Sequence, residues 1–195
     1  MSTLKRDPAA ATHDTYDVIV IGGGIYGVCL SLLAAAEGMR PLLLERGDFG
    51  GETSYNSLRI LHGGLRYLQT LDLPRFFESV GERHWFLRVF PDLTESLPCL
   101  MPLYGKGARR PPVLKAALAL NDTLSRSRNE GVHPDCHLAN GRVVSAAAVR
   151  DRFPQVDTQG LQGGAIWADG SMPDSQRIIM ELVRWGTTLG ATALN

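Results

Sequence analysis

The sequence predicts an α/β fold with a parallel sheet, and three features near the N-terminus support this prediction. Val18–Ile21 is a run of apolar, β-branched residues, too short for an isolated helix and typical of a buried parallel strand. A helix-like apolar stretch follows over residues 28–37, and Gly38 ends it. Residues 40–45 form a second apolar run that reads as another strand. Strand, helix and strand in this order indicate an α/β unit.

The glycines between the first strand and the helix predict a dinucleotide site. Gly22, Gly24 and Gly27 have the spacing Gly-x-Gly-x-x-Gly. The first permits a tight turn, the second lets backbone approach a pyrophosphate, and the third lets the helix pack closely on the strand. Glu45 follows Gly27 by eighteen residues, near the spacing of about 20 at which an acid binds an adenosine ribose. A glycine-rich turn in another α/β unit is the alternative.

Composition and charge fit a globular protein without a nucleic-acid partner. The chain of 195 residues is 44% apolar, and its 20 basic and 20 acidic residues cancel. No apolar run approaches the roughly 18–20 residues that span a bilayer. Residues 1–15 lack the apolar region of a signal peptide and are expected to be a disordered tail. The 3 cysteines are far apart, which favours reduced thiols and a cytoplasmic location.

Two segments after Glu45 are rich in glycine. Residues 46–57 form a loop whose small hydroxyls and amides suit phosphate and ribose oxygens, with a solvent-exposed connection as the alternative. Residues 58–68 read as an apolar, helix-like segment interrupted by Gly63 and Gly64. Because glycine inside a helix costs about 1 kcal/mol relative to alanine, the pair indicates that something flat lies against this backbone.

Three segments together resemble a known family. They are residues 16–27, Thr53-Ser54, and the string His62-Gly63-Gly64-Leu65-Arg66-Tyr67-Leu68. They resemble the FAD-dependent glycerol-3-phosphate dehydrogenases, within the D-amino-acid-oxidase-like flavoprotein superfamily. The string at residues 62–68 is the specific part, because the glycine motif is shared across the superfamily. Residues 163–175 are similar to a later strand and helix start of the family, whereas residues 125–145 match poorly.

The resemblance implies a Rossmann-like FAD-binding domain, partial and three-layered, with a parallel sheet and an inserted helical and extended segment. The residues that it implies in FAD binding are Gly22, Gly24, Ile25, Tyr26, Gly27, Glu45, Arg46, Thr53, Ser54, Leu61, His62, Gly63, Gly64 and Leu65. Arg66 and Tyr67 are expected to face the substrate, because an arginine fork suits a phosphomonoester. A structural ion pair is the alternative for Arg66. Tyr26 stands where family members commonly have a small polar residue.

The implied reaction of the complete enzyme oxidises sn-glycerol 3-phosphate to dihydroxyacetone phosphate, with electrons passing through FAD to quinone. An amine or amino-acid oxidase of the same superfamily, a non-catalytic FAD-binding fragment and an NAD site are the alternatives. The Arg66-Tyr67 pair argues against the oxidase, and the hydroxyl loop and glycine pair argue against NAD. Since the family continues beyond Asn195, residues 16–195 are interpreted as a C-terminally truncated FAD-binding oxidoreductase domain, with the catalytic base unidentified.

The middle of the chain predicts helices and a strand but no clear functional motif. Residues 73–90 read as an amphipathic helix, broken near Gly81, with Arg83 on its solvated face. Residues 96–104, with prolines inside, read as an edge strand. Residues 113–124 read as a helix, and its basic flanks are Lys106, Arg109, Arg110, Lys115, Arg126 and Arg128. A core-facing helix with solvated ends is expected there, with peripheral contact to an anionic membrane as the alternative.

The C-terminal third predicts no metal site and several regular elements. Residues 133–137 contain two histidines and one cysteine, too few ligands for zinc, and are expected to be a polar loop. Residues 142–144 read as a strand and residues 145–152 as a short helix capped by Ser145. Residues 163–168 predict another strand, residues 174–189 a helix opened by Pro173, and residues 191–195 the start of a further strand.

Overall fold

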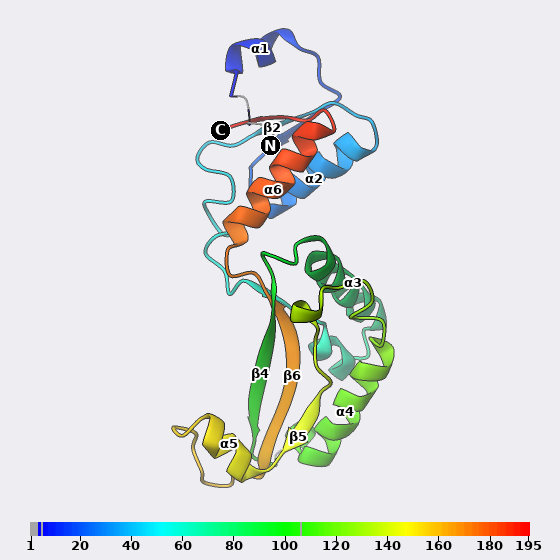
Figure 1. Cartoon of the computed structure of the whole chain (residues 1–195), viewed down its shortest axis with the longest axis vertical. Helices are drawn as coiled ribbons and strands as arrows, with labels where there is room; N and C mark the ends of the chain where they lie inside the picture. The colour runs from blue at the N-terminus through cyan, green and yellow to red at the C-terminus, as the bar shows by residue number, and fades with distance from the viewer. Residues whose placement is uncertain (1–3, 5, 106) are drawn as a thin grey trace. The chain divides into compact units, whose positions relative to one another are not determined.

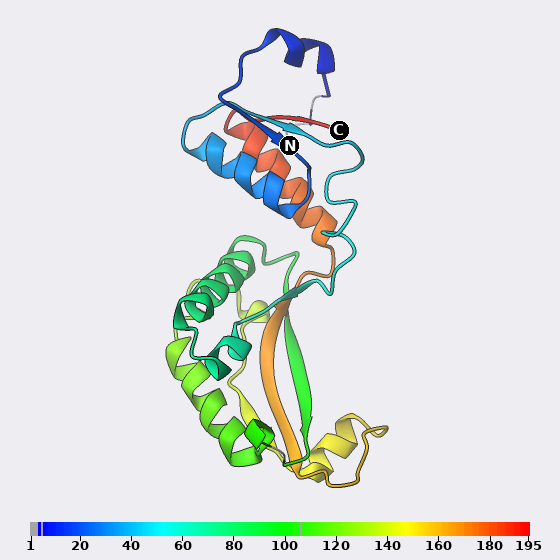
Figure 2. The same cartoon turned by 180° about the vertical axis from the view of Figure 1, so that it is seen from behind.

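A computed structural model describes residue 4 and residues 6–105 and 107–195 of the chain. The chain divides into two compact units, shown in Figures 1 and 2. Unit 1 is Met1–Arg59 with Pro173–Asn195, and unit 2 is Ile60–Met172. The sequence prediction had a single domain over residues 16–195. Unit 2 accordingly corresponds to the inserted helical and extended segment of the predicted fold.

Unit 1 is a small α/β layer with a parallel sheet, as predicted. Its strands are β1 (Val18–Ile21), β2 (Pro41–Leu44) and β7 (Thr192–Leu194). β2 lies in the centre and pairs in parallel with both others, from Val18 opposite Pro41 to Leu44 opposite Leu194. Its helices are α1 (Pro8–His13), α2 (Ile25–Ala36) and α6 (Ser175–Thr188). α2 and α6 lie side by side along the sheet (Figures 1 and 2).

The core of unit 1 comes from the apolar faces of α2 and α6. Val28 and Leu32 of α2 are buried, as are Ile178 and Leu182 of α6. α2 begins at Ile25, directly after Gly24 and three residues before the predicted helix. α6 begins at Ser175, one residue after the predicted start, because the Asp174 carboxylate caps it by accepting from the Arg177 amide at 3.0 Å. The predicted strand at the C-terminus is confirmed as β7.

The first strand is less buried than the sequence predicts. Only Val20 is buried, whereas Ile19 is 58% and Ile21 87% exposed. The reason is that β1 pairs only with β2 among the described residues, so one edge of the strand and one of its faces are open. Residues 1–3 and 5 lie outside the described residues. The disordered tail at residues 1–15 stays a prediction, and the structure has the short helix α1 within it.

Unit 2 is an antiparallel sheet covered by helices. Its strands are β3 (Ile60–Leu61), β4 (Glu95–Leu103), β5 (Arg142–Val144) and β6 (Gly163–Ser171). β6 lies in the centre and pairs with the other three. The α-helices are α3 (Leu73–Val89), α4 (Pro111–Leu124) and α5 (Ala146–Arg152). The 3-10 helices are η1 (Leu65–Gln69), η2 (Gly107–Arg109) and η3 (Pro134–Cys136).

Several predictions for unit 2 are confirmed. Within the described part of the chain, β4 is an edge strand whose one neighbour is β6, which accommodates prolines 98 and 102. α4 faces the core, because Leu114 and Leu118 pack with Leu103 of β4 and Ala165 of β6. β5 and α5 lie where expected, and the Ser145 hydroxyl accepts from the Ala148 amide at 3.2 Å. β6 continues three residues beyond the predicted strand.

Two helix predictions in unit 2 are wrong. α3 runs unbroken through Gly81, because that glycine lies on an exposed face where nothing disturbs the helix. Residues 58–68 are not one helix-like segment: β3 and η1 are separate, and Gly64 between them has φ of +75°. The left-handed conformation at Gly64 turns the chain out of the strand and into η1, which local apolar periodicity does not encode.

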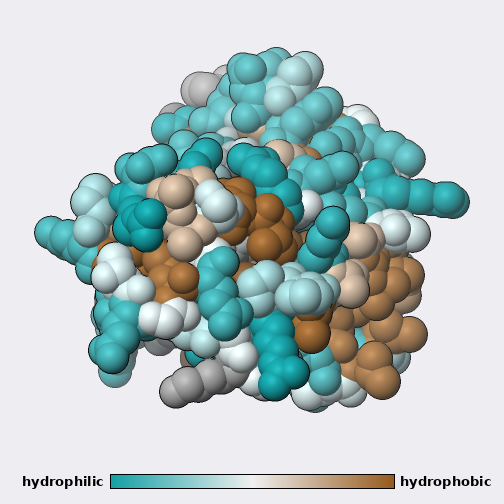
Figure 3. All heavy atoms as spheres, turned by 90° about the horizontal axis from the view of Figure 1, so that it is seen from below, coloured by the Kyte–Doolittle hydropathy of each residue, from teal (hydrophilic) through white to brown (hydrophobic). Residues whose placement is uncertain are grey.

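Polar and charged side chains on the surface alternate with apolar patches, as Figure 3 shows for one face.

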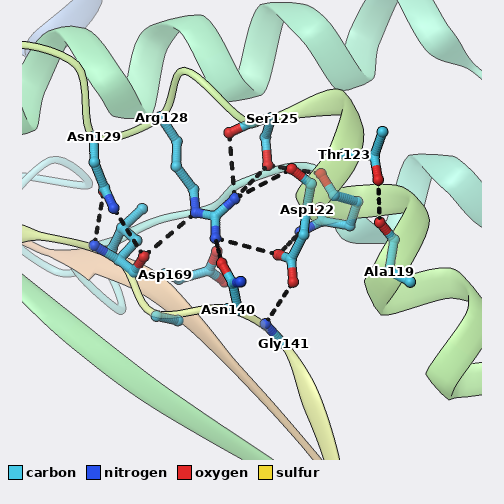
Figure 4. Close-up of polar contacts among 12 residues, drawn as sticks. Ala119, Asp122, Thr123, Ser125, Arg128, Asn129, Asn140, Gly141 and Asp169 are labelled. Atoms are coloured by element: carbon cyan, nitrogen blue, oxygen red, sulfur yellow. Dashed lines mark hydrogen bonds and ion pairs between the residues drawn. The ribbon is translucent and has the colours of Figure 1, made fainter.

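Two arginines that the sequence placed in solvent are instead buried: Arg83 is 4% and Arg128 7% exposed. Arg128 donates to the Leu138 carbonyl at 3.4 Å and lies 3.4 Å from the Asp122 carboxylate (Figure 4). It also donates to Asn140. These contacts hold Arg128 against the C-terminal end of α4, so it is not part of a basic surface.

Further features of the described residues bear on membrane and metal binding. No helix among them is both long and apolar enough to cross a bilayer. The described part of the chain also has no cluster of three histidine, cysteine or acidic side chains able to hold a metal ion. Cys136 of η3 is buried and donates its thiol to the Thr94 carbonyl at 3.3 Å. Lys106, one of the basic residues beside α4, lies outside the described residues.

Candidate functional site

The glycine turn of unit 1 has the geometry that its motif predicts. Gly22 has φ of +108°, which lets the chain leave β1 in a tight turn. Its amide donates to the Leu44 carbonyl at 2.7 Å, so the turn stays attached to β2. A Cβ atom on Gly27 would overlap the Gly22 carbonyl oxygen. The close approach of α2 to the turn therefore requires glycine at position 27.

The N-terminus of α2 is directed into this turn. The first amides of a helix have no intrahelical acceptor, and here the Ile25 amide donates to the Ser54 hydroxyl at 2.9 Å. Ser54 thus lies beside the helix end where a phosphate is expected to bind. Its carbonyl accepts from the Ser175 hydroxyl at 3.2 Å, which fixes the loop against α6. The structure brings Gly24, Ile25 and Ser54 together, and their part in cofactor binding stays a prediction.

Glu45 at the end of β2 holds the same turn. Its carboxylate accepts from the Gly23 amide at 2.6 Å and from the Gly47 amide at 2.7 Å. The hydrogen bonds from the Gly47 and Gly23 amides lower the pKa of Glu45, against a smaller opposing effect of desolvation. Glu45 is therefore ionised near neutral pH. A carboxylate has about four lone-pair positions, so acceptor capacity remains for ribose hydroxyls.

The other predicted cofactor residues in unit 1 have exposed side chains. The Tyr26 side chain is 90% exposed, and the Arg46 and Thr53 side chains are also exposed. None of the three makes a hydrogen bond through its side chain to the other described residues. Their part in cofactor binding stays a prediction.

Unit 2 contains a cavity of about 630 Å³. Its polar lining comes from His62, Arg66, Tyr67, Gln69 and Asp169, and its apolar lining includes Leu65, Met101, Leu120 and Trp167. The predicted flavin-side residues His62, Gly64 and Leu65 thus share one cavity with the predicted substrate residues. Arg66 is exposed and makes no ion pair with any residue that the structure describes, so the alternative of a structural ion pair has no support.

Asp169 of β6 lines this cavity and connects several of its neighbours. It is 6% exposed. Its Oδ1 accepts from the Gly63 amide and from Arg83 Nη1, both at 2.9 Å. Its Oδ2 accepts from Trp167 Nε1 at 3.2 Å and lies 3.5 Å from His62 Nδ1. Burial lowers the pKa of Arg83, and the charge of Asp169 opposes that shift.

This arrangement changes the roles expected within residues 61–65. Leu61 is buried and packs against Gly170 of the neighbouring strand. The Gly63 amide is occupied by Asp169, so it is not a free donor toward a ligand. His62 is 67% exposed at its side chain and lines the cavity.

Sequence reasoning missed Asp169 and Arg83 as residues of this site. Arg83 was assigned to solvent because its position in a charged helix segment looked like the polar face. The available signal was that Arg83 follows Phe76 and Val80 by seven and three residues, which places all three on one helical face. Asp169 lies in a strand of otherwise apolar and small residues, where a buried carboxylate requires a partner.

The fold and the turn together define a class: an α/β protein with a dinucleotide-binding glycine turn. The turn leaves room for FAD in this structure, because no described atom lies within 4 Å of a Cβ built on Gly22, and the N-terminus of α2 lies beside it, where the Ile25 amide donates to the Ser54 hydroxyl. Residues 17–195 match the family "DAO: FAD dependent oxidoreductase". The chain belongs to this family of FAD-dependent oxidoreductases, whose cofactor is FAD.

Among curated relatives, the chain is similar to glycerophosphate dehydrogenases and oxidases. The chain is 34% identical over 183 residues to a glycerol-3-phosphate dehydrogenase of Synechocystis, covering 94% of this chain and 32% of the relative. It is 33% identical to an alpha-glycerophosphate oxidase of Streptococcus pneumoniae, covering 93% of this chain and 29% of the relative. A mitochondrial glycerol-3-phosphate dehydrogenase of Saccharomyces cerevisiae is 32% identical, covering 97% and 28%.

Solved structures agree with the fold. The glycerol-3-phosphate dehydrogenase of Bacillus halodurans, complexed with FAD, matches with a TM-score of 0.61 at 21% identity over 93% of this chain and 26% of that one. The FAD-bound L-alpha-glycerophosphate oxidase of Mycoplasma pneumoniae matches with a TM-score of 0.62 at 13% identity, over 92% and 44%. The chain spans about a third or less of the length of the curated relatives named above.

Proposed function

We propose that this chain is the FAD-binding part of an enzyme that oxidises sn-glycerol 3-phosphate to dihydroxyacetone phosphate. One observation carries the proposal: the chain is 32–34% identical, over more than nine tenths of its length, to glycerophosphate dehydrogenases and oxidases from bacteria and yeast. The cavity lined by the string at residues 62–68 agrees with it. Bound FAD supplies the acceptor for the hydride of the substrate's carbinol carbon.

The residues of unit 1 bind the nucleotide end of the cofactor in this proposal. The turn from Gly22 to Gly27 and the α2 amides receive the pyrophosphate, assisted by the helix dipole. The Ser54 hydroxyl lies at that helix end, where it accepts from the Ile25 amide. In this proposal the same hydroxyl is able to donate to a phosphate oxygen. Glu45 accepts from the ribose hydroxyls while holding the turn through Gly23. Arg46, Tyr26 and Thr53 lie at the exposed rim.

The residues of unit 2 bind the substrate and the flavin side. The guanidinium of Arg66 presents two parallel donors and a positive charge, which match a phosphomonoester. Tyr67 borders the same cavity and contributes a hydroxyl. The apolar residues Leu65, Met101 and Leu120 form part of the wall of the same cavity. Asp169 holds the chain from which His62 and Arg66 extend.

A quinone as electron acceptor and peripheral contact with the cytoplasmic face of a membrane complete the proposal. The supporting feature is the exposed basic group Arg109, Arg110, Lys115 and Arg126 near the two ends of α4. Basic side chains near a helix attract anionic lipids. Binding of the chain to vesicles with and without anionic lipid, at low and high salt, tests this part by itself.

An absorbance experiment tests the main proposal. The purified chain is mixed with FAD, passed through gel filtration, and then titrated anaerobically with glycerol 3-phosphate. Retained flavin that bleaches supports the proposed reaction, and Arg66→Met is expected to raise the substrate concentration needed for bleaching. Bleaching by amino acids instead supports the amine or amino-acid oxidase alternative. Retained flavin that no substrate bleaches supports a non-catalytic FAD-binding fragment.

A further inference from the structure

A long-range hydrogen bond to Asp169 holds the segment between β3 and η1. β3 pairs with β6 only at Ile60 and Leu61, so the chain leaves the sheet directly before His62. Gly63, two residues after the strand, is buried, and its amide donates to Asp169 Oδ1 at 2.9 Å. Gly64 then takes φ of +75° and η1 begins. The direction in which this turn leaves the sheet is therefore set by the position of the Asp169 carboxylate.

The guanidinium of Arg83 completes the support of the turn from α3. It donates to Asp169 Oδ1 at 2.9 Å and to the Ala168 carbonyl at 3.3 Å. A Cβ atom on residue 63 would overlap both terminal nitrogens of Arg83. The glycine at position 63 is thus explained by the guanidinium that packs against its backbone. Asp169, Arg83 and Gly63 form a single fitted group from three distant parts of the sequence.

We propose that Asp169 is the positioning residue of the Gly63–Gly64 turn, and that its pair with Arg83 fixes the backbone carrying His62 and Arg66 into the cavity. The inference rests on the proposed function only in taking this cavity as the place where flavin and substrate bind. Asp169 acts on the turn through the Gly63 amide, which donates to its Oδ1 at 2.9 Å. Loss of the carboxylate removes the acceptor of that amide and the anchor of the guanidinium together.

The first measurement uses the isotope-labelled chain without FAD. Amide hydrogen exchange is followed by NMR in the wild type, in Asp169→Ala, and in the control Asp135→Asn, whose side chain is 90% exposed in the same unit. In Asp169→Ala we expect exchange at Gly63 to accelerate about tenfold or more, because a buried hydrogen bond to a charged group is lost. Exchange in the β1–β2 ladder is expected to stay unchanged. The Asp135→Asn control is expected to match the wild type throughout.

The second measurement tests whether loss of the Asp169 carboxylate changes the environment of the bound flavin. Each variant is loaded with FAD, and the visible absorbance and flavin fluorescence are recorded without substrate. Asp169→Ala is expected to retain FAD through unit 1 and to show a flavin spectrum shifted toward that of free FAD. Arg83→Gln combined with Asp169→Asn keeps an oxygen acceptor for Gly63 without a buried charge. This double variant is expected to restore both the slow Gly63 exchange and the wild-type spectrum.

The outcomes separate this inference from the proposed function. Unchanged Gly63 exchange in a folded Asp169→Ala chain overturns it, and so does acceleration spread equally over both units. Should Asp169→Ala fail to fold, the double variant decides: fast Gly63 exchange with a retained acceptor overturns the inference, and slow exchange supports it. A chain that does not oxidise glycerol 3-phosphate leaves the exchange result unaffected, because that measurement uses no cofactor and no substrate.

Discussion

The glycine turn of unit 1 and the glycine pair of unit 2 are held by contacts of different range along the sequence. In unit 1, Gly23 is bound by Glu45, 22 residues away, and Ile25 by Ser54, 29 residues away. In unit 2, Gly63 is bound by Asp169, 106 residues away. The unit 1 contacts are part-buried or exposed, whereas the Asp169 contacts to Gly63 and Arg83 are buried.

This difference explains why one site could be predicted and the other only in outline. A turn that binds phosphate through its own amides requires a fixed local spacing of glycines, which is visible in the sequence. A turn held by a buried ion pair requires partners that folding brings together from elsewhere. Removing one partner of the ion pair is also expected to destabilise the fold strongly, because the other charge is then buried without compensation.

The largest expected effect comes from breaking that ion pair. Arg83→Met is expected to lower the free energy of unfolding by about 3–5 kcal/mol, because Asp169 then stays buried without its charged partner. Arg75→Met on the same helix is the control, since its side chain is 68% exposed and its pair with Asp72 is expected to contribute less than about 1 kcal/mol. Urea-induced unfolding of both variants measures the difference. Equal effects would contradict the buried position of Arg83.

The next largest effect is expected when the same substitution, glycine to alanine, is made at Gly27 and at Gly81 and the changes in stability are compared. Gly27→Ala places a Cβ atom onto the Gly22 carbonyl, so a loss of about 1–3 kcal/mol is expected, together with loss of FAD retention. Gly81→Ala in α3 meets nothing within 4 Å and is expected to stabilise the chain by about 0.5–1 kcal/mol through helix propensity. Unfolding and gel filtration with FAD measure both. The same sign at both positions would show that close packing at Gly27 is not the reason for its glycine.

Glu45 is expected to make the stability of the folded chain depend on pH, with a smaller effect than the substitutions above. Because its pKa is lowered in the folded chain, its stabilisation is complete above the ordinary value of about 4.3 and is lost as the pH falls through the lowered value. Glu45→Gln is therefore expected to be less stable than the wild type at pH 7, by about 1 kcal/mol after allowance for partial exposure. Thermal unfolding between about pH 3 and 7 should show the two chains converging at low pH. A constant difference would contradict a role of the charge.

The smallest effect is expected from the loop that borders α2. Ser54→Ala removes the acceptor of the Ile25 amide, and about 0.5–1 kcal/mol is the expected loss for such a cap. Thr53→Ala alters an exposed neighbour and serves as the control with no change in stability. Thermal unfolding measures both variants. If FAD affinity falls more in Thr53→Ala than in Ser54→Ala, the threonine hydroxyl, and not the helix cap, is the group that contacts the cofactor.

Local sequence was sufficient for most of unit 1 and for the boundaries of several elements in unit 2. Residue types and their spacing predicted the order β1–α2–β2, the turn at Gly22, the helix end at Gly38, the Ser145 cap and the edge position of β4. Backbone conformation and capping depend on a few neighbouring residues. The cavity residues Arg66 and Tyr67 were found through resemblance, and the structure places them together with His62.

Only the tertiary structure decided which charged side chains are buried and which apolar ones are exposed. Arg83 and Arg128 were assigned to solvent by the polarity of their neighbours, yet each is buried beside a carboxylate, Asp169 and Asp122 respectively. Ile19 and Ile21 read as core and are exposed, because β1 has one strand neighbour among the described residues. Burial is a property of what packs against a residue. The local pattern does not identify partners up to 106 residues away.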